Sequence, residues 1–387
     1  MRLFRRVSAA AGVALAAACS TAVPPPGQPP AQSAQSAPPI APPVSAPPRT
    51  PLTSGRMAVA SLPGWAEEDH AAALAAFVAG CSAPAAPAQA CAEARALGRP
   101  GRAEARAFLE RTFVAEPVAG TGLLTGYYAP QYEARTQPDP EFSAPVRPKP
   151  ADLVTLELGA FDPTLAGRRI VGRVMEGTFQ PYPARALIDR RATPPEGVLA
   201  WMRPEELFFL QIQGSGVLTY PGGSRRRAAF AAHNGRPFVG IAKPMRERGL
   251  LADNQTSGAN IQAWLAAHRG PEAAALMAEN PRYVFFNLEP DTGQDPPGAA
   301  GVRLPAGRAV AIDPTQHAYG QPLWIDADAG ALAGSFPTYR RLVTALDTGG
   351  AIKGAVRADL YVGQGPTAGT EAGRIRHTLR MYRLVPR

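Results

Sequence analysis

The spacing of apolar residues divides the chain into a helical opening, a long strand-rich body and one helical interruption. Apolar residues recur at helical spacing in residues 66–81 and 101–114, with acidic residues early in the first of these segments. From Gly122 onward they fall in short runs broken by Gly and Pro, which is typical of strands and turns. Helical spacing returns over 258–280. The pattern predicts a mainly β protein with some α, and its many short strands favour a barrel over a doubly wound sheet.

The predicted strands fall into two groups, one before and one after the helical interruption. The first group comprises "LLTGYYAPQYEA" (123–134), "RRIVGRV" (168–174), "LFFLQIQGSGVLTY" (207–220) and "RPFVGIA" (236–242). The second comprises "RYVFFNLE" (282–289), "GRAVAIDP" (307–314), "PLWIDADA" (322–329), "YRRLVTALDTGG" (339–350), "ADLYVG" (358–363) and "RMYRLVP" (380–386).

The N-terminal segment has the pattern of an export signal followed by a tether. Three arginines precede an apolar run that is too short to span a bilayer, so we predict a signal peptide over residues 1–18. "LAAAC" is similar to a bacterial lipoprotein cleavage box and makes Cys19 the candidate lipidation site, with plain A-x-A cleavage as the alternative. Residues 19–55 are rich in proline and cannot bury enough surface to fold. The prediction is a protein of the cell envelope, lipid-anchored to the outer membrane and facing the periplasm.

The net charge narrows the choice of binding partners, and the cysteine content allows a disulfide. The 387 residues carry a formal net charge of +9, which is compatible with an anionic membrane face or an acidic polymer. No run of Lys and Arg is longer than residues 225–227, so nucleic acid is disfavoured as a partner. In an exported protein, Cys81 and Cys91 form either a short-range disulfide or two buried thiols.

Several common catalytic arrangements are excluded by spacing. The five histidines show no zinc-site spacing, so no metal and no cofactor are expected. Ser215 lacks the glycine that a nucleophile elbow needs at position 213, so Gly214–Ser215–Gly216 is interpreted as a turn that brings backbone close to a ligand. Gln211 and Gln213 would share one face of a strand and are candidates for binding sugar hydroxyl and N-acetyl groups, unless that face is simply solvated.

Carboxylates are the remaining candidates for catalysis. Asp313, Asp347 and Asp359 lie in or at the ends of apolar strands, where carboxylates are rare. Such surroundings raise a carboxyl pKa, as a general acid requires. Asp313 and Asp347 are also typical turn residues, whereas Asp359 has no turn residue beside it. The single D-T-G at Asp347 does not suit an aspartic protease, which needs two such loops to pair its carboxylates.

Six segments resemble those of one enzyme family. They are "LLTGYYAPQYEAR" (123–135), "FFLQIQGSGVL" (208–218), "AAHNGRPFVGI" (231–241), "NPRYVFF" (280–286), "AIDPTQHAYGQPLWID" (311–326) and "LDTGGAIKGAVRADLYVGQG" (346–365). Their content and order are similar to the membrane-bound lytic murein transglycosylase A family. The last segment resembles its 3D domain, whose three aspartates fall on Asp313, Asp347 and Asp359. His317 stands where other members are expected to carry an apolar residue or a proline.

The resemblance implies a two-domain architecture. A double-psi β-barrel would be formed by residues 56–132 and 285–387, and a smaller substrate-binding β-domain, residues 133–284, would be inserted in it. A groove between the two domains would hold a peptidoglycan glycan strand. Other cell-wall enzymes are further candidate partners.

The resemblance also implies a reaction. The family cleaves the β-1,4 bond between N-acetylmuramic acid and N-acetylglucosamine without water, and it leaves a 1,6-anhydromuramic end. Asp359 would act as acid and then as base, with Asp347 raising its pKa or orienting it. Thr125 matches a position lining the active site. The other candidates for substrate contact are Gly126, Tyr127, Tyr128, Gln211, Gln213 and Ser215, while Asp313 and Lys353 would have supporting roles.

Two alternatives remain open on the sequence. The same barrel could carry a peptidoglycan glycoside hydrolase, which would need a second carboxylate to direct water or attack carbon. The chain could also be a cell-wall-binding lipoprotein without catalytic activity.

Overall fold

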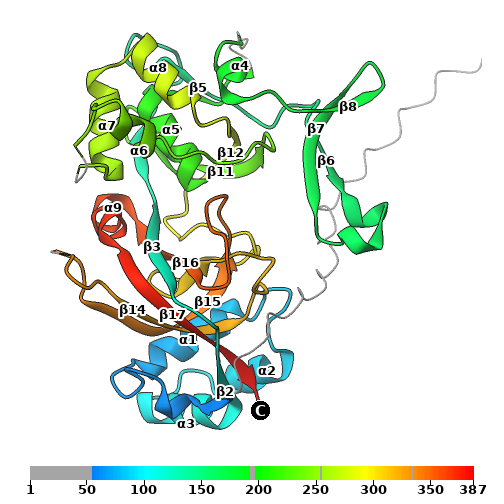
Figure 1. Cartoon of the computed structure of the whole chain (residues 1–387), viewed down its shortest axis with the longest axis vertical. Helices are drawn as coiled ribbons and strands as arrows, with labels where there is room; N and C mark the ends of the chain where they lie inside the picture. The colour runs from blue at the N-terminus through cyan, green and yellow to red at the C-terminus, as the bar shows by residue number, and fades with distance from the viewer. Residues whose placement is uncertain (1–54, 192–196, 253–254, 333) are drawn as a thin grey trace, which may run out of the picture. The chain divides into compact units, whose positions relative to one another are not determined.

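The computed structural model describes residues 55–191, 197–252, 255–332 and 334–387 (Figure 1). The predicted signal peptide, Cys19 and all but the last residue of the predicted tether lie outside these ranges. The described part is mixed α/β with more strand than helix. None of its helices is long and apolar enough to cross a membrane.

The largest sheet combines strands from both ends of the described chain. Its order is β1-β2-β17-β14-β15-β13-β16-β3. β17 also pairs with β3, so six strands (β3 and β13–β17) form a closed ring of pairings. Figure 1 shows β3 beside the much later β16 and β17. The strands are β1 (Met57–Ala58), β2 (Phe113–Pro117), β3 (Gly122–Ala129), β13 (Ala309–Ala311), β14 (Pro322–Asp328), β15 (Thr338–Asp347), β16 (Arg357–Gln364) and β17 (Arg376–Pro386).

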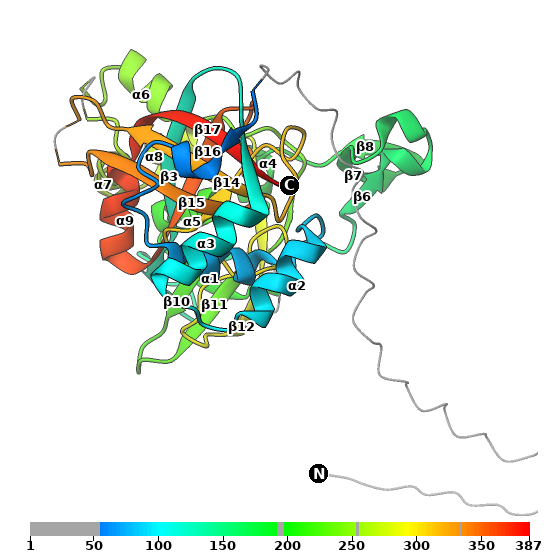
Figure 2. The same cartoon turned by 90° about the horizontal axis from the view of Figure 1, so that it is seen from below.

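Three N-terminal helices cover one face of this sheet. They are α1 (His70–Gly80), α2 (Ala88–Ala96) and α3 (Arg102–Thr112), and Figure 2 shows them close to β14 and β15. Trp324 of β14 packs against Trp65 within their core, whereas Leu323 and Ile325 face a second core on the other side of the sheet. Covering on both sides explains why β14 is apolar along most of its length instead of alternating.

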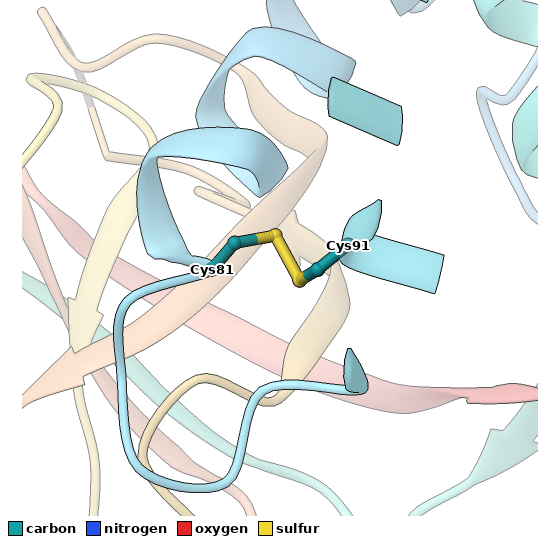
Figure 3. The surroundings of a disulfide bond; sticks show 2 residues. All are labelled: Cys81 and Cys91. Atoms are coloured by element: carbon teal, nitrogen blue, oxygen red, sulfur yellow. A yellow bond between two sulfur atoms is a disulfide. The ribbon is translucent and has the colours of Figure 1, made fainter. Parts of the chain in front are cut away.

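A disulfide between Cys81 and Cys91 holds the first two helices together (Figure 3). Cys81 directly follows α1 and Cys91 lies within α2. Of the two alternatives left open by the sequence, the structure has the disulfide.

Residues between β3 and β13 form a second group of sheets and helices. A four-stranded sheet has the order β12-β11-β10-β4, and two smaller sheets comprise β5 with β9 and β6 with β7 and β8. The strands are β4 (Gln131–Glu133), β5 (Ala144–Val146), β6 (Val154–Glu157), β7 (Arg169–Met175), β8 (Thr178–Pro181), β9 (Ala200–Met202), β10 (Gly216–Thr219), β11 (Arg225–His233) and β12 (Val284–Pro290). The helices are α4 (Arg185–Asp189), α5 (Pro204–Gln213), α6 (Ala242–Glu247), α7 (Gly258–Ala267) and α8 (Pro271–Ala278).

Two predicted strands in this group are wrong. The first half of "LFFLQIQGSGVLTY" is helix α5, and only Gly216–Thr219 is a strand. Residues 236–242 contain no strand and lead into α6. In addition, helix α9 (Gly365–Arg374) follows β16 directly, where no helix was predicted. Because β4 and β12 both belong to the four-stranded sheet, that sheet reaches from Gln131 to Pro290, a few residues beyond the predicted limits of the insertion at each end.

Candidate active site

The pairing of β16 with β3 brings Asp359 beside Thr125. The two strands are parallel, and Asp359 lies directly opposite Thr125. The Thr125 hydroxyl donates a hydrogen bond of 2.5 Å to Oδ1 of Asp359. A residue predicted to line the active site therefore contacts the predicted acid, although the two are 234 positions apart.

Asp347 approaches the same region from the other side of β13. Ala311 in β13 pairs with Asp359 on one side and with Asp347 on the other, so the two aspartates are two strands apart. Two strand spacings separate their backbones by roughly 10 Å. Tyr127, two residues after Thr125 in β3, donates a hydrogen bond of 2.7 Å from its hydroxyl to Oδ2 of Asp347. One strand therefore supplies a hydrogen-bond donor to each aspartate.

The oxygens of Asp347 are engaged by three donors. Its Oδ1 accepts the backbone N–H groups of Ala299 and Thr348, each at 2.9 Å, and its Oδ2 accepts the Tyr127 hydroxyl. Burial raises the pKa of Asp347, while these three hydrogen bonds favour the charged carboxylate and act in the opposite direction. The arrangement holds the Asp347 side chain in one orientation.

Asp359 lies in surroundings that favour its protonated form. Burial is the largest cause of its raised pKa, and the charge of Asp347 raises it further. The Thr125 hydrogen bond and the nearby Arg357 act in the opposite direction. Asp359 as a whole residue nevertheless keeps some exposure to solvent. A raised pKa is what a carboxyl group needs in order to donate a proton and later accept one.

Arg357 belongs to this site and was not predicted from the sequence. One guanidinium nitrogen donates to Oγ1 of Thr125 at 2.9 Å, and another donates to the Leu123 carbonyl at 3.3 Å. Arg357 lies two residues before Asp359 on the same strand, so both side chains project from one face. That i, i+2 relation was the only signal in the sequence that could have identified it.

Asp313 accepts hydrogen bonds from a loop and takes no part in the hydrogen bonds of Asp347 and Asp359 described above. Its Oδ1 accepts hydrogen bonds from the backbone N–H and the hydroxyl of Thr315, and its Oδ2 accepts from Gly354 N–H at 2.9 Å. Burial alone would raise the pKa of Asp313, but these hydrogen bonds and the charge of Lys353 outweigh it and lower the pKa. The geometry is that of a turn-forming aspartate. Lys353 is exposed in the loop that Asp313 holds.

The predicted sugar-binding residues have differing environments. Gln211 is buried in α5 and donates to the Val284 carbonyl at 3.2 Å, whereas Gln213 accepts a hydrogen bond of 3.4 Å from Tyr128 N–H. The predicted strand face with both amides is therefore wrong, because these residues end a helix. Ser215 follows Gly214, which terminates α5 with φ of 86°.

The contacts of Gly126 and His317 indicate roles in packing. A Cβ on Gly126 would lie 2.9 Å from the Ala372 Cα atom, so glycine allows α9 to pack closely on β3. His317 is buried, and its Nε2 lies 2.7 Å from the Ala355 carbonyl. Burial lowers the pKa of His317, so the ring is neutral at neutral pH. Within the described ranges, no three His, Cys, Asp or Glu side chains gather as they would around a metal ion.

Comparison with known proteins identifies the family. The MltA specific insert domain matches residues 123–287, and the 3D domain matches residues 308–385. The crystal structure of a membrane-bound lytic murein transglycosylase from Agrobacterium tumefaciens superimposes with a TM-score of 0.73 at 30% identity, covering 86% of this chain and 97% of that one. The chain belongs to the MltA family of lytic transglycosylases. MltA from Neisseria gonorrhoeae gives a TM-score of 0.71 at 31% identity, covering 90% of this chain and 98% of that one.

A curated MltA relative agrees in sequence. Membrane-bound lytic murein transglycosylase A of Vibrio cholerae is 30% identical over 273 residues, which are 68% of this chain and 66% of that protein. The matched region thus spans just under two thirds of the length of the relative.

Proposed function

We propose that this MltA family member cleaves the β-1,4 bond between N-acetylmuramic acid and N-acetylglucosamine in peptidoglycan without using water. The observation that carries the proposal is the carboxyl group of Asp359, a residue that is not fully buried, whose pKa is raised and which Thr125 holds in place. Asp347, the neighbouring carboxylate, has both oxygens engaged by fixed donors. It therefore suits a supporting role better than that of a second catalytic carboxylate.

Asp359 acts first as an acid and then as a base. In its protonated form it donates its proton to the glycosidic oxygen as the bond to C1 of the muramoyl residue breaks. The resulting carboxylate then accepts the proton of the C6 hydroxyl while that oxygen attacks C1. The products are a 1,6-anhydromuramic end and a free hydroxyl on the leaving sugar. Because the sugar supplies its own nucleophile, positioning takes the place of an activated water.

Neighbouring residues adjust Asp359 for both steps. The negative charge of Asp347 stabilises the protonated form, while Thr125 and Arg357 stabilise the carboxylate. Tyr128 and Ser215 remain candidates for substrate contact because both are partly exposed.

We further propose the architecture and location that the family implies. The closed ring of strand pairings supports a double-psi β-barrel, with the sheet changing at about Pro130 and Pro290 to the inserted substrate-binding domain. The glycan strand would lie in a groove between these domains. Lipidation at Cys19 would anchor the protein to the outer membrane, with the body facing the periplasm.

Cleavage of purified sacculi in ¹⁸O-labelled water tests the reaction. Mass spectrometry should find anhydromuramic ends that contain no solvent oxygen, and Asp359→Asn should abolish their release while the fold is retained. Labelled reducing ends would instead establish a hydrolase. A wild-type protein that binds sacculi without releasing any fragment would establish a binding protein without catalytic activity.

A further inference from the structure

A concave site lies in the inserted region, and neither Asp359 nor Asp347 belongs to its lining. It is a cavity with a volume of about 630 Å³. β7 and β8 form one wall and the end of β11 forms another. Its lining includes Lys149, Arg169, Phe179, Phe230 and His233.

The lining combines apolar surface with positive charge. Phe230 is 50% exposed and Ile170 is 41% exposed, although side chains of this kind are usually covered. Lys149 is exposed, and no described carboxylate forms an ion pair with it. Arg169 already pairs with Glu157, which leaves Lys149 as the lining cation without an ion pair among the described residues. A ligand with both aliphatic groups and carboxylates would complement this surface.

His233 contributes shape and a polar edge but no charge. Its Nδ1 accepts a hydrogen bond of 2.9 Å from Gly235 N–H. Burial, followed by the charge of Arg282, lowers the pKa of His233 to about 4. The ring is therefore neutral at neutral pH, and the positive charge of the cavity comes from Lys149 and Arg169.

Electrostatic interactions link lining residues with the surroundings of Asp347. The charges of Arg169 and Asp347 both act on the phenol of Tyr319, in opposite directions. Separately, a Cβ on Gly350 would lie 3.4 Å from Phe238 and 3.7 Å from the guanidinium carbon of Arg282. Arg282 in turn acts on His233 of the lining, so charged groups at the cavity lie within electrostatic range of residues around Asp347.

We propose that this cavity binds the acidic stem peptide that muramic acid residues of peptidoglycan carry. The inference rests on the proposed function, which places a glycan strand at Asp359. A stem peptide offers carboxylates to Lys149 and Arg169 and short aliphatic side chains to Phe230. The cavity makes the enzyme selective for strands that still carry peptides.

The test compares cleavage of peptide-bearing strands with cleavage of the same strands after an amidase has removed the peptides. The wild type should have the higher kcat/KM on the peptide-bearing strands. Lys149→Gln and Phe230→Ala should each lower the ratio of the two values by about 5-fold, the change expected for one partly exposed contact. Lys243→Gln is the matched control, because Lys243 is exposed on α6, pairs with Glu247 and is not part of this lining. It should leave the ratio unchanged.

A binding measurement separates this inference from the proposed function. Calorimetric titration of full-length Asp359→Asn with the free stem tetrapeptide should show binding that Lys149→Gln weakens by about the same factor. Lys149-dependent binding without cleavage of either substrate would sink the proposed reaction and keep the cavity assignment. The assignment of the cavity to the stem peptide would be overturned by two results together. The ratio of kcat/KM on peptide-bearing strands to kcat/KM on peptide-free strands would be equal for Lys149→Gln and Lys243→Gln, and the tetrapeptide would not bind.

Discussion

Alternation along one strand places two side chains where they act on different carboxylates. Thr125 and Tyr127 project from the same face of β3, and they donate to Asp359 and Asp347 respectively. A donor stabilises the charged form of the carboxylate that it contacts. The two hydroxyls therefore have opposite effects on the pKa of Asp359, one directly and one through the charge of Asp347.

Removing the Thr125 hydroxyl should raise the pKa of Asp359 further. In Thr125→Val the carboxylate loses the hydrogen bond that lowers its pKa, so the protonated acid persists to higher pH. The alkaline limb of the profile of kcat/KM against pH should move to higher pH. The maximum of kcat/KM should be lower, because the Asp359 side chain is less well positioned. Thr125→Ser, which keeps the hydroxyl, should restore the profile. A limb that stays in place in Thr125→Val would show that the hydrogen bond does not set the pKa of the acid.

Removing the Tyr127 hydroxyl should lower the pKa of Asp359. Tyr127→Phe deprives Asp347 of one of the three donors that hold it ionised, so the pKa of Asp347 rises. A less ionised Asp347 no longer raises the pKa of Asp359 as strongly, and the alkaline limb should move to lower pH. Loss of this hydrogen bond should also reduce the free energy of unfolding by about 1–3 kcal/mol. Measured pH profiles that shift the same way in Thr125→Val and Tyr127→Phe would contradict the assigned roles.

The sequence predicts the individual residues of this site better than their contacts. Asp359 stands out because it is a carboxylate in an apolar strand without a turn residue beside it. Its contact with Thr125 depends on a parallel pairing across 234 positions, which local pattern does not encode. Only the family resemblance indicated that Thr125 lies near the acid, and it gave no indication of Arg357.

At the scale of single elements, α5 shows how a short apolar run is misassigned. Leu207, Phe208 and Leu210 are buried with Gln211, which is the spacing of one helical face. Pro204 at the first turn, two acidic residues beside it and Gly214 at the end are helix boundary signals. The sequence contains these signals, but the neighbouring "GSGVLTY" run has strand character and favours a strand over the whole segment.

Helix α9 could not be predicted from its own sequence. It contains two internal glycines, which weaken helices. The close approach to β3 that Gly126 permits supplies the packing that local propensity lacks. Tertiary contacts therefore determine this element, as they often do for weak helices.

The disulfide gives the helical cover a measurable share of its stability. Closing the loop between Cys81 and Cys91, which are 10 residues apart, removes conformational freedom from the unfolded chain. We expect Cys81→Ala/Cys91→Ala to lower the free energy of unfolding by about 2–3 kcal/mol. Denaturant unfolding with and without reductant measures this difference. Reductant should destabilise the wild type and leave the double variant unchanged, and equal sensitivity of the two proteins would argue against a disulfide in solution.

At the scale of the whole molecule, the reacting centre is complete only when both ends of the described chain have come together. β3 supplies Thr125 before the insertion, while β13, β15 and β16 supply the other side more than 180 residues later along the printed sequence. β17 joins these parts, because it pairs with β14, β2 and β3. Without β17, the ring of six strands would be open between β14 and β3.

A chain that ends at Ile375 should therefore fail to form the site. The deletion removes three fully buried apolar side chains, Leu379, Met381 and Leu384, each of which contributes about 1.5–3 kcal/mol. It also leaves three strand edges without their hydrogen-bond partner. The sum is comparable with the total stability of a typical domain, about 5–15 kcal/mol.

Circular dichroism, size-exclusion chromatography and release of fragments from sacculi would together measure this loss. Deletion of Arg387 alone is the control, because that residue follows the last strand and should be dispensable for folding. A truncated protein that unfolds cooperatively and still cleaves sacculi would show that the remaining strands hold Thr125 against Asp359 without closure by β17. If the chain ending at Ile375 loses cooperative unfolding and the chain lacking only Arg387 keeps it, closure of the ring by β17 is required for folding. The position of Asp359 then depends on this closure as well as on its contact with Thr125.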